Sequence, residues 1–99
     1  MYGLTPNDLK MILSVFKKYP DIKQVFIFGS RAMGNFKPGS DIDIAVKGDV
    51  SEEVISLISI ELNERLPMPY KFDVLAYSLI ENEDLKKHID QYGKCLLSA

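Results

Sequence analysis

The chain has 99 residues, of which 46% are hydrophobic and 26% charged, and its formal net charge is −2. These values predict one small globular domain over residues 1–99 and argue against autonomous binding to DNA, which needs a clustered basic surface. A nucleotide is compatible with this charge, because a metal ion and a few backbone amides can meet its phosphates locally. Cys95 is the single cysteine, so no internal disulfide and no cysteine spacing typical of a zinc site is possible. No apolar run approaches the ~20 residues of a membrane span. We therefore expect a cytoplasmic protein.

The first third of the chain predicts a helix followed by a strand. Thr5 is the expected N-cap, Pro6 fits the first helical position, and Asp8 completes a T-x-x-D capping box. Apolar residues then recur at helical spacing until Pro20 ends the helix. Residues 24–28, QVFIF, are typical of a largely buried strand that ends at Gly-Ser, after which RAM suggests one helical turn and GNFKPG a loop.

Residues 40–48, SDIDIAVKG, predict a second strand with aspartates on one face and isoleucines on the other. Ser51 is the expected N-cap of a second helix, and Pro67 and Pro69 lie beyond its end. Its apolar face is marked by Val54, Leu57, Ile58 and Leu62, with Glu61 out of pattern.

Residues 70–77, YKFDVLAY, predict a third strand, again with an aspartate inside an apolar run. Asn82 is expected to cap a last helix that runs to about Tyr92, and KCLLS suggests a short terminal strand. The link between the first two strands is too short for a crossover helix, so these strands should be antiparallel neighbours. The pattern predicts an α+β fold, a small mixed β-sheet with helices on one face, which leaves the other face or one end open for a site.

Asp41, Asp43 and Asp73 are the candidate catalytic and metal-binding residues. Aspartate is costly to bury unless it is paired or bound to a metal, and it is a poor strand former. Asp41 and Asp43 lie on the same face of a strand, roughly 6.5–7 Å apart at Cα, and Asp73 on a neighbouring strand would add a third carboxylate. Two such side chains can converge on one cation or on two cations ~3.5–4 Å apart, the separation found in phosphoryl-transfer sites. Mg²⁺ is the expected cation, because it prefers hard oxygen ligands together with substrate phosphates.

The Gly29-Ser30 pair is the candidate phosphate-binding turn. Glycine allows close approach of the backbone to a ligand, and the free N–H groups at the start of a helical turn attract anions. The expected nucleotide-binding set is Gly29, Ser30, Arg31 and Ser40. His88, the single histidine, is interpreted as a structural side chain rather than a catalytic base.

The stretch GSRAMGNFKPGSDIDIAV resembles the G-S-x10-D-x-D signature of the polymerase-beta-like nucleotidyltransferase superfamily, and Asp73 in KFDVLAY resembles its third acidic residue. The resemblance covers nearly the whole chain and is strongest to the minimal nucleotidyltransferases, also called MNT-domain proteins. It implies the catalytic palm fold and transfer of AMP from ATP to an acceptor hydroxyl. It also implies two Mg²⁺ ions held by the three aspartates, and phosphates held by Gly29 and Ser30.

Many small MNT-domain proteins are antitoxins of HEPN-domain ribonucleases, and can transfer AMP to a tyrosine of that toxin. The resemblance therefore implies a HEPN-domain partner. Two alternatives stay open. In the first, the chain is a nucleotidyltransferase subunit that acts on a small molecule or an RNA end. In the second, it is a non-catalytic module that masks its partner by contact.

Overall fold

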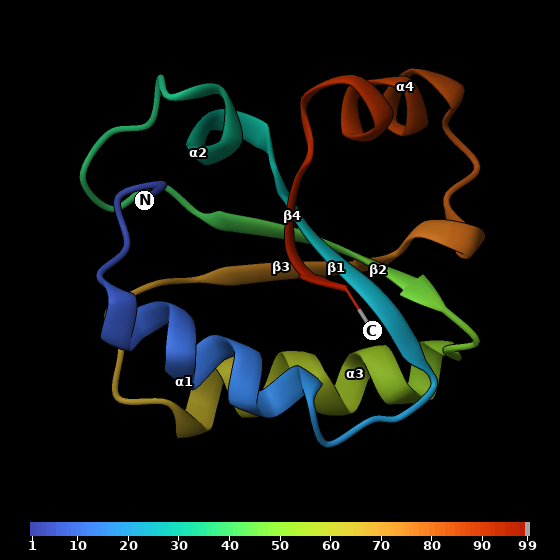
Figure 1. Ribbon diagram of the computed structural model, residues 1–99, viewed down its shortest axis with the longest axis horizontal. Coiled ribbons are helices and arrows are strands. Elements are labelled where there is room, and N and C mark those ends of the chain that lie inside the picture. The colour runs from blue at the N-terminus through green and yellow to red at the C-terminus, as the bar shows by residue number, and fades with distance from the viewer. Residues whose placement is uncertain (99) are drawn as a thin grey trace.

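A four-stranded mixed sheet forms the centre of the protein in a computed structural model that describes residues 1–98 (Figure 1). The strand order is β3-β2-β1-β4. Strand β1 (Ile22–Phe28) is antiparallel to both β2 (Ile42–Gly48) and β4 (Lys94–Ser98), whereas β2 and β3 (Phe72–Ala76) are parallel. The predicted antiparallel pairing of the first two strands is confirmed. Helix α3 (Glu52–Ile60) lies in the longer connection that a parallel pair requires.

Helices lie on both faces of this sheet. Figure 1 shows α1 (Pro6–Phe16) and α3 below the strands, and α4 (Glu83–Tyr92) with the short α2 (Gly29–Met33) above them. The α+β class is confirmed, and α1 and α3 share one face as expected. Helix α4 differs from the expected arrangement, because it packs against the face that was expected to stay open. It does so through a small second core of buried Phe28, Ala45 and Ile89.

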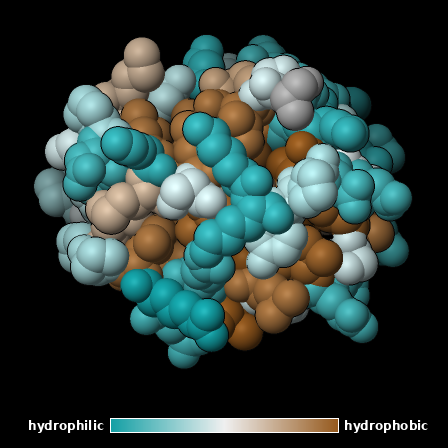
Figure 2. All heavy atoms as spheres, turned by 60° about the horizontal axis from the view of Figure 1, so that its bottom comes forward, coloured by the Kyte–Doolittle hydropathy of each residue, from teal (hydrophilic) through white to brown (hydrophobic). Residues whose placement is uncertain are grey.

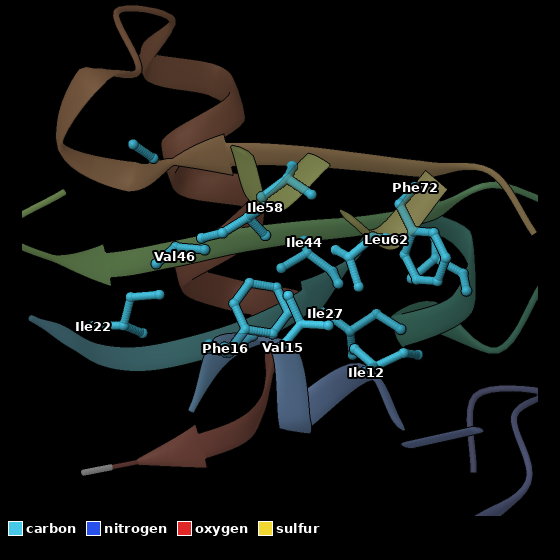
Figure 3. Close-up of a cluster of buried hydrophobic side chains, with 14 of the residues drawn as sticks. Ile12, Val15, Phe16, Ile22, Ile27, Ile44, Val46, Ile58, Leu62 and Phe72 are labelled. Atoms are coloured by element: carbon cyan, nitrogen blue, oxygen red, sulfur yellow. The ribbon is translucent and has the colours of Figure 1, made fainter. Parts of the chain in front are cut away.

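The main core lies between the sheet and the pair α1 and α3. Side chains alternate along a strand, so β1 and β2 send Ile27 and Ile44 to this side, where both are fully buried. They meet side chains from both helices and from the chain beyond α3, including Ile12, Val15, Phe16, Ile58 and Leu62 (Figure 3). Burial of each such side chain stabilises the fold by about 1.5–3 kcal/mol relative to exposure.

The helix starts follow the capping signals in the sequence. The Thr5 hydroxyl accepts from the Asp8 N–H at 3.0 Å, and the Asp8 carboxylate accepts from the Thr5 N–H at 3.1 Å, which confirms the capping box. Ser51 and Asn82 cap α3 and α4 as predicted. Helix α1 ends at Phe16, earlier than the Pro20 signal indicates, because a turn precedes that proline.

The strand boundaries differ from the predicted ones by up to two residues. Strand β1 begins at Ile22 rather than at residue 24, and β2 begins at Ile42 rather than at residue 40. Strand β3 covers Phe72–Ala76 instead of residues 70–77, and the terminal strand is confirmed as β4. Asp41 therefore lies just before β2 and not inside it.

A π-helix, η1 (Glu61–Arg65), extends α3 and fixes the start of β3. The Asn63 side chain accepts from the Phe72 N–H at 2.8 Å and donates to the Phe72 carbonyl at 3.1 Å. These two bonds imitate a neighbouring strand at the outer edge of the sheet, and they hold the residue that directly precedes Asp73.

The outer surface of α3 carries one correction to the predicted helix face. Leu57 was expected on the apolar face, but 57% of it is exposed, because Ile58 and Leu62 point into the core and Leu57 is turned ~100° from Ile58. Ile60 is also exposed. Figure 2, with the α1 and α3 side brought forward, shows apolar atoms gathered between hydrophilic ones. Among residues 1–98, no helix is both long and apolar enough to cross a membrane.

Candidate active site

Two of the three candidate aspartates lie side by side on neighbouring strands. Asp43 of β2 and Asp73 of β3 are direct partners in the parallel register, so their side chains point to the same face, about 4.8 Å apart at the backbone. Asp41 precedes β2 by one residue. Asp41 and Asp73 are exposed, whereas Asp43 is half-buried. The fold therefore places the three predicted carboxylates at one end of the sheet.

The pKa of Asp43 reflects its burial and the negative charges around it. Its partial burial is the largest cause that raises its pKa above the ordinary value of 3.8, and the negative charges of Asp73 and Asp41 raise it further. The positive charge of an imidazolium at His88 acts in the opposite direction and lowers the pKa of the same carboxyl group. Negative charge at this end of the sheet is thus under-compensated, which is the condition that a bound cation relieves.

The Gly29-Ser30 turn lies against Asp43. Phe28, the last residue of β1, is the register partner of Asp43, so the chain turns into α2 beside that carboxylate. Gly29 has φ +72°, a backbone conformation that residues other than glycine rarely adopt. A Cβ at this position would also overlap Asp43 Oδ2. Only a residue without a side chain fits here, which explains the glycine of the pair in physical terms.

The Arg31 side chain is buried and hydrogen-bonded to backbone carbonyls of the protein. Its side chain is only 3% exposed, and its guanidinium donates to the Ser40 carbonyl at 2.8 and 3.1 Å and to the Tyr2 carbonyl at 2.9 Å. The rings of Phe36 and Tyr70 lie 5.2 and 5.1 Å from it. These contacts tie α2 to the loop before β2. The expected contact of Arg31 with phosphate stays a prediction.

Ser40 takes part in the same loop structure. Its hydroxyl accepts from the Lys37 N–H at 2.9 Å, while its carbonyl accepts from Arg31. The structure thus brings Gly29, Asp43 and Asp73 together and assigns Arg31 and Ser40 to holding the loop. The expected nucleotide contacts of Ser30 stay a prediction.

The sequence suggested a structural role for His88 but did not indicate its contact with this region. It lies on α4, and its Nε2 accepts a hydrogen bond from the Gly29 N–H at 3.1 Å. Nothing in the local sequence signals this contact, because His88 and Gly29 are 59 residues apart and meet only when α4 packs over the sheet. The one available signal is helical spacing. His88 is three residues after Leu85 and one before Ile89, and both of these apolar residues face the strands.

The carboxylate oxygens of the three aspartates are of the ligand type that magnesium prefers. Among residues 1–98, no group of three or more His, Cys, Asp or Glu side chains is gathered closely enough to hold a metal ion by itself. Magnesium is usually bound by only one or two carboxylates, with substrate phosphates and water completing its shell. The raised pKa of Asp43 and the oxygen-only donor set suit a hard divalent cation that arrives together with a nucleotide.

Comparison with known sequences places the chain in a family. A model described as "Polymerase beta, Nucleotidyltransferase" matches residues 10–99. A candidate protein adenylyltransferase of Methanocaldococcus jannaschii is 36% identical over 64 residues, which cover 65% of this chain and 58% of that relative. The alignment thus spans less than two thirds of the relative's length.

Solved structures share the fold. A crystal structure of a toxin–antitoxin with AMP-PNP matches with a TM-score of 0.78 and 21% identity, over 93% of this chain and 74% of that one. The complex of a tri-AMPylated Shewanella oneidensis HEPN toxin with its MNT antitoxin matches with a TM-score of 0.69 and 19% identity, over 92% and 70% of the two chains. At these identities the likeness concerns the fold alone. The family model, in contrast, spans nearly the whole sequence, and so this chain belongs to the polymerase-beta nucleotidyltransferase family.

Proposed function

We propose that this protein transfers AMP from ATP to a hydroxyl acceptor, a tyrosine of a partner HEPN ribonuclease, and that it thereby acts as the antitoxin of that ribonuclease. The observation that carries the proposal is the pairing of Asp43 with Asp73 in the β2–β3 register, directly beside the Gly29-Ser30 turn. The M. jannaschii relative is named as a candidate protein adenylyltransferase, and the S. oneidensis structure contains a HEPN toxin that carries AMP. Both support this choice of acceptor over a small molecule or an RNA end.

The proposed chemistry divides the residues into two groups. Asp41, Asp43 and Asp73 would hold two Mg²⁺ ions, which when bound neutralise phosphate charge and favour ionisation of the attacking hydroxyl. Gly29 and Ser30 would lie against the triphosphate. A bond forms between the acceptor oxygen and the α-phosphorus, and the bond from the α-phosphorus to the bridging oxygen breaks, so that pyrophosphate leaves with the electron pair. Asp73, the exposed member of the strand pair, would receive the hydroxyl proton.

We expect the partner to complete the site. The carboxylates and the turn lie at one end of a small sheet, and in the proposed reaction the acceptor hydroxyl comes from the partner. Catalysis of phosphoryl transfer depends mainly on positioning and charge neutralisation, so an acceptor that is not held should react slowly. The protein alone should therefore turn over ATP weakly.

The test is transfer to the partner. The purified protein is incubated with labelled ATP, Mg²⁺ and the HEPN protein encoded beside it, and the mass of that protein is measured. An increase equal to one or more AMP groups, located on tyrosine by peptide mapping, is the expected result. The double variant Asp41→Asn/Asp43→Asn should abolish transfer. Its matched control, Asp21→Asn/Asp49→Asn, removes the same charge from exposed residues outside the site and should retain transfer.

The other outcomes separate the alternatives. Tight complex formation with no added mass would favour a module that masks its partner by contact. Efficient transfer to a small molecule or an RNA end without the partner would favour the other nucleotidyltransferase function. Unchanged transfer by the Asp41→Asn/Asp43→Asn variant would refute the site itself.

A further inference from the structure

His88 connects α4 to the turn that begins the candidate site. The Gly29 N–H donates to His88 Nε2 at 3.1 Å, and the side chain is half-buried. An acceptor nitrogen carries no proton, so in this arrangement the imidazole is neutral, with its proton on Nδ1. The turn that His88 contacts lies in turn against Asp43, because a Cβ on Gly29 would overlap Asp43 Oδ2. His88 and Asp43 thus both contact the Gly29 turn.

The ring of His88 is held in place by aromatic neighbours. Phe28 at the end of β1 meets it edge to face, with centroids 6.1 Å apart and planes at 75°, and Tyr92, one turn further along α4, lies 5.3 Å away. Phe28 also belongs to the small core that attaches α4 to the sheet. The position of Nε2 is therefore set by packing between two elements and not by a free surface rotamer.

Gly29 needs such a fixed partner. Glycine populates positive and negative φ about equally, so its left-handed conformation is not set by the residue itself. In this protein the position that a Cβ of Gly29 would take lies against Asp43 Oδ2, and the Gly29 N–H donates to His88. The turn is therefore held from two sides, and the second side comes from a helix late in the chain.

We propose that His88 is a positioning residue of the nucleotide site, and that it acts by holding the Gly29 N–H so that the β1–α2 turn and Asp43 face one ligand before that ligand binds. The inference rests on the proposed nucleotidyl transfer. A turn that is ordered in advance loses less conformational entropy on binding, so His88 strengthens nucleotide affinity without touching the nucleotide. The Gly29 amide is then occupied by His88, and phosphate contacts fall to Ser30 and the residues after it.

Three substitutions separate this role from simple packing. His88→Gln places an amide oxygen near the position of Nε2, whereas His88→Asn reaches only as far as Nδ1, and His88→Leu removes the acceptor. Lys87→Leu, at the exposed neighbouring position of α4, controls for a leucine in this helix. Amide hydrogen exchange of Gly29, followed by NMR on the free protein, reports the hydrogen bond directly. The Nδ1-protonated tautomer should be visible in the long-range nitrogen–proton spectrum of the wild type.

We expect Gly29 exchange to accelerate about tenfold in His88→Leu and His88→Asn, and to stay near the wild-type rate in His88→Gln and Lys87→Leu. The Kd for ATP with Mg²⁺, measured by titration, should rise by roughly five- to tenfold in the same two variants and recover in His88→Gln. Equal Gly29 protection in all five proteins would overturn the inference. If His88→Leu fails to fold, the Gln and Asn variants carry the test, and equal Gly29 protection in those two overturns it.

The two readouts also separate this inference from the proposed function. A wild-type protein that binds no nucleotide would contradict the proposed function, while the exchange rates would still decide whether His88 holds the turn. Normal nucleotide binding in all variants, despite faster Gly29 exchange, would overturn the claim that the turn must be fixed for binding.

Discussion

Gly29 leaves no room for a side chain in the site. Its φ of +72° and its contact with Asp43 are two separate reasons for glycine, and the chain offers a position that has only the first. Gly39 has φ +83°, but a Cβ there would meet nothing within 4 Å. A comparison of the two glycines therefore isolates the contact with the carboxylate.

We expect Gly29→Ala to lower the free energy of unfolding by about 2 kcal/mol more than Gly39→Ala does. Both alanines are strained in the left-handed region, but only the first is forced against Asp43, which must move. Urea unfolding of the two variants measures the difference. Equal losses would contradict the close approach of Gly29 to Asp43.

Asp43 should make stability depend on pH in an unusual direction for a carboxylate. Its pKa is raised in the folded protein above 3.8, so the folded state binds this proton more tightly than the unfolded state does. The stabilising contribution of protonated Asp43 is therefore present below about pH 4. It is lost as pH rises through the raised pKa, and it is absent at neutral pH. A neutral side chain at position 43 avoids this loss of stability.

The prediction is that Asp43→Asn melts at a higher temperature than the wild type at pH 7 without divalent cations, and that the gap closes as pH falls toward about 3. Thermal melts followed by circular dichroism across this range measure the gap. Asp49→Asn makes the same charge change at an exposed residue just beyond the other end of β2 and serves as the control. A lower melting temperature for Asp43→Asn at pH 7 would contradict the raised pKa.

At the scale of elements, Arg31 holds the segment between β1 and β2. It ties α2 to the Ser40 and Tyr2 carbonyls from a position that is 3% exposed. Lysine keeps the charge but not the planar fork that reaches two carbonyls, and a buried group left without its partners costs about 1–3 kcal/mol.

We expect Arg31→Lys to lower the free energy of unfolding by about 2–3 kcal/mol, whereas Lys37→Met, which removes an exposed cation of the same loop, changes it by less than about 0.5 kcal/mol. Chemical denaturation measures both changes. Unchanged stability together with weaker ATP binding by Arg31→Lys would instead restore the phosphate role that the sequence suggests.

Local signals in the sequence were sufficient for most elements and for the acidic part of the site. Capping residues located the starts of all three long helices, and strand alternation put Asp43 on the face opposite Ile44. The boundaries were less certain, because a strand end depends on where a partner strand stops. Asp41 fell outside β2 for this reason.

The remaining features depend on contacts that no local pattern encodes. Helix α4 crosses to the second face of the sheet because Phe28 and Ala45 offer an apolar surface for Ile89 there, and this contact brings His88 to Gly29. Arg31 looked like a phosphate ligand in a glycine-rich loop, but its carbonyl partners, Tyr2 and Ser40, become visible only when the N-terminal segment and the loop fold over it.

At the scale of the whole molecule, the fold assembles one site from segments that are far apart in the chain. The parallel register of β2 and β3 brings Asp43 to Asp73, and in an unfolded chain these carboxylates do not share a neighbourhood. A cation that binds the assembled group and not the unfolded chain must therefore stabilise the fold. The stabilisation is RT ln(1 + [L]/Kd), or about 2.7 kcal/mol when the ligand concentration is 100 times Kd.

We accordingly expect Mg²⁺ with a non-hydrolysable ATP analogue to raise the melting temperature of the wild type in a concentration-dependent way. The measured quantity is the ligand-dependent increment, because Asp43→Asn alone already changes the stability of the free protein. The increment should vanish in Asp41→Asn/Asp43→Asn and persist in Asp21→Asn/Asp49→Asn, with KCl added to hold ionic strength constant so that screening is matched. An equal increment in both double variants would place the cation and its nucleotide elsewhere on the molecule. Loss of the increment in the first variant only would tie the stability of the whole fold to the end of the sheet where β2, β3 and the Gly29 turn meet.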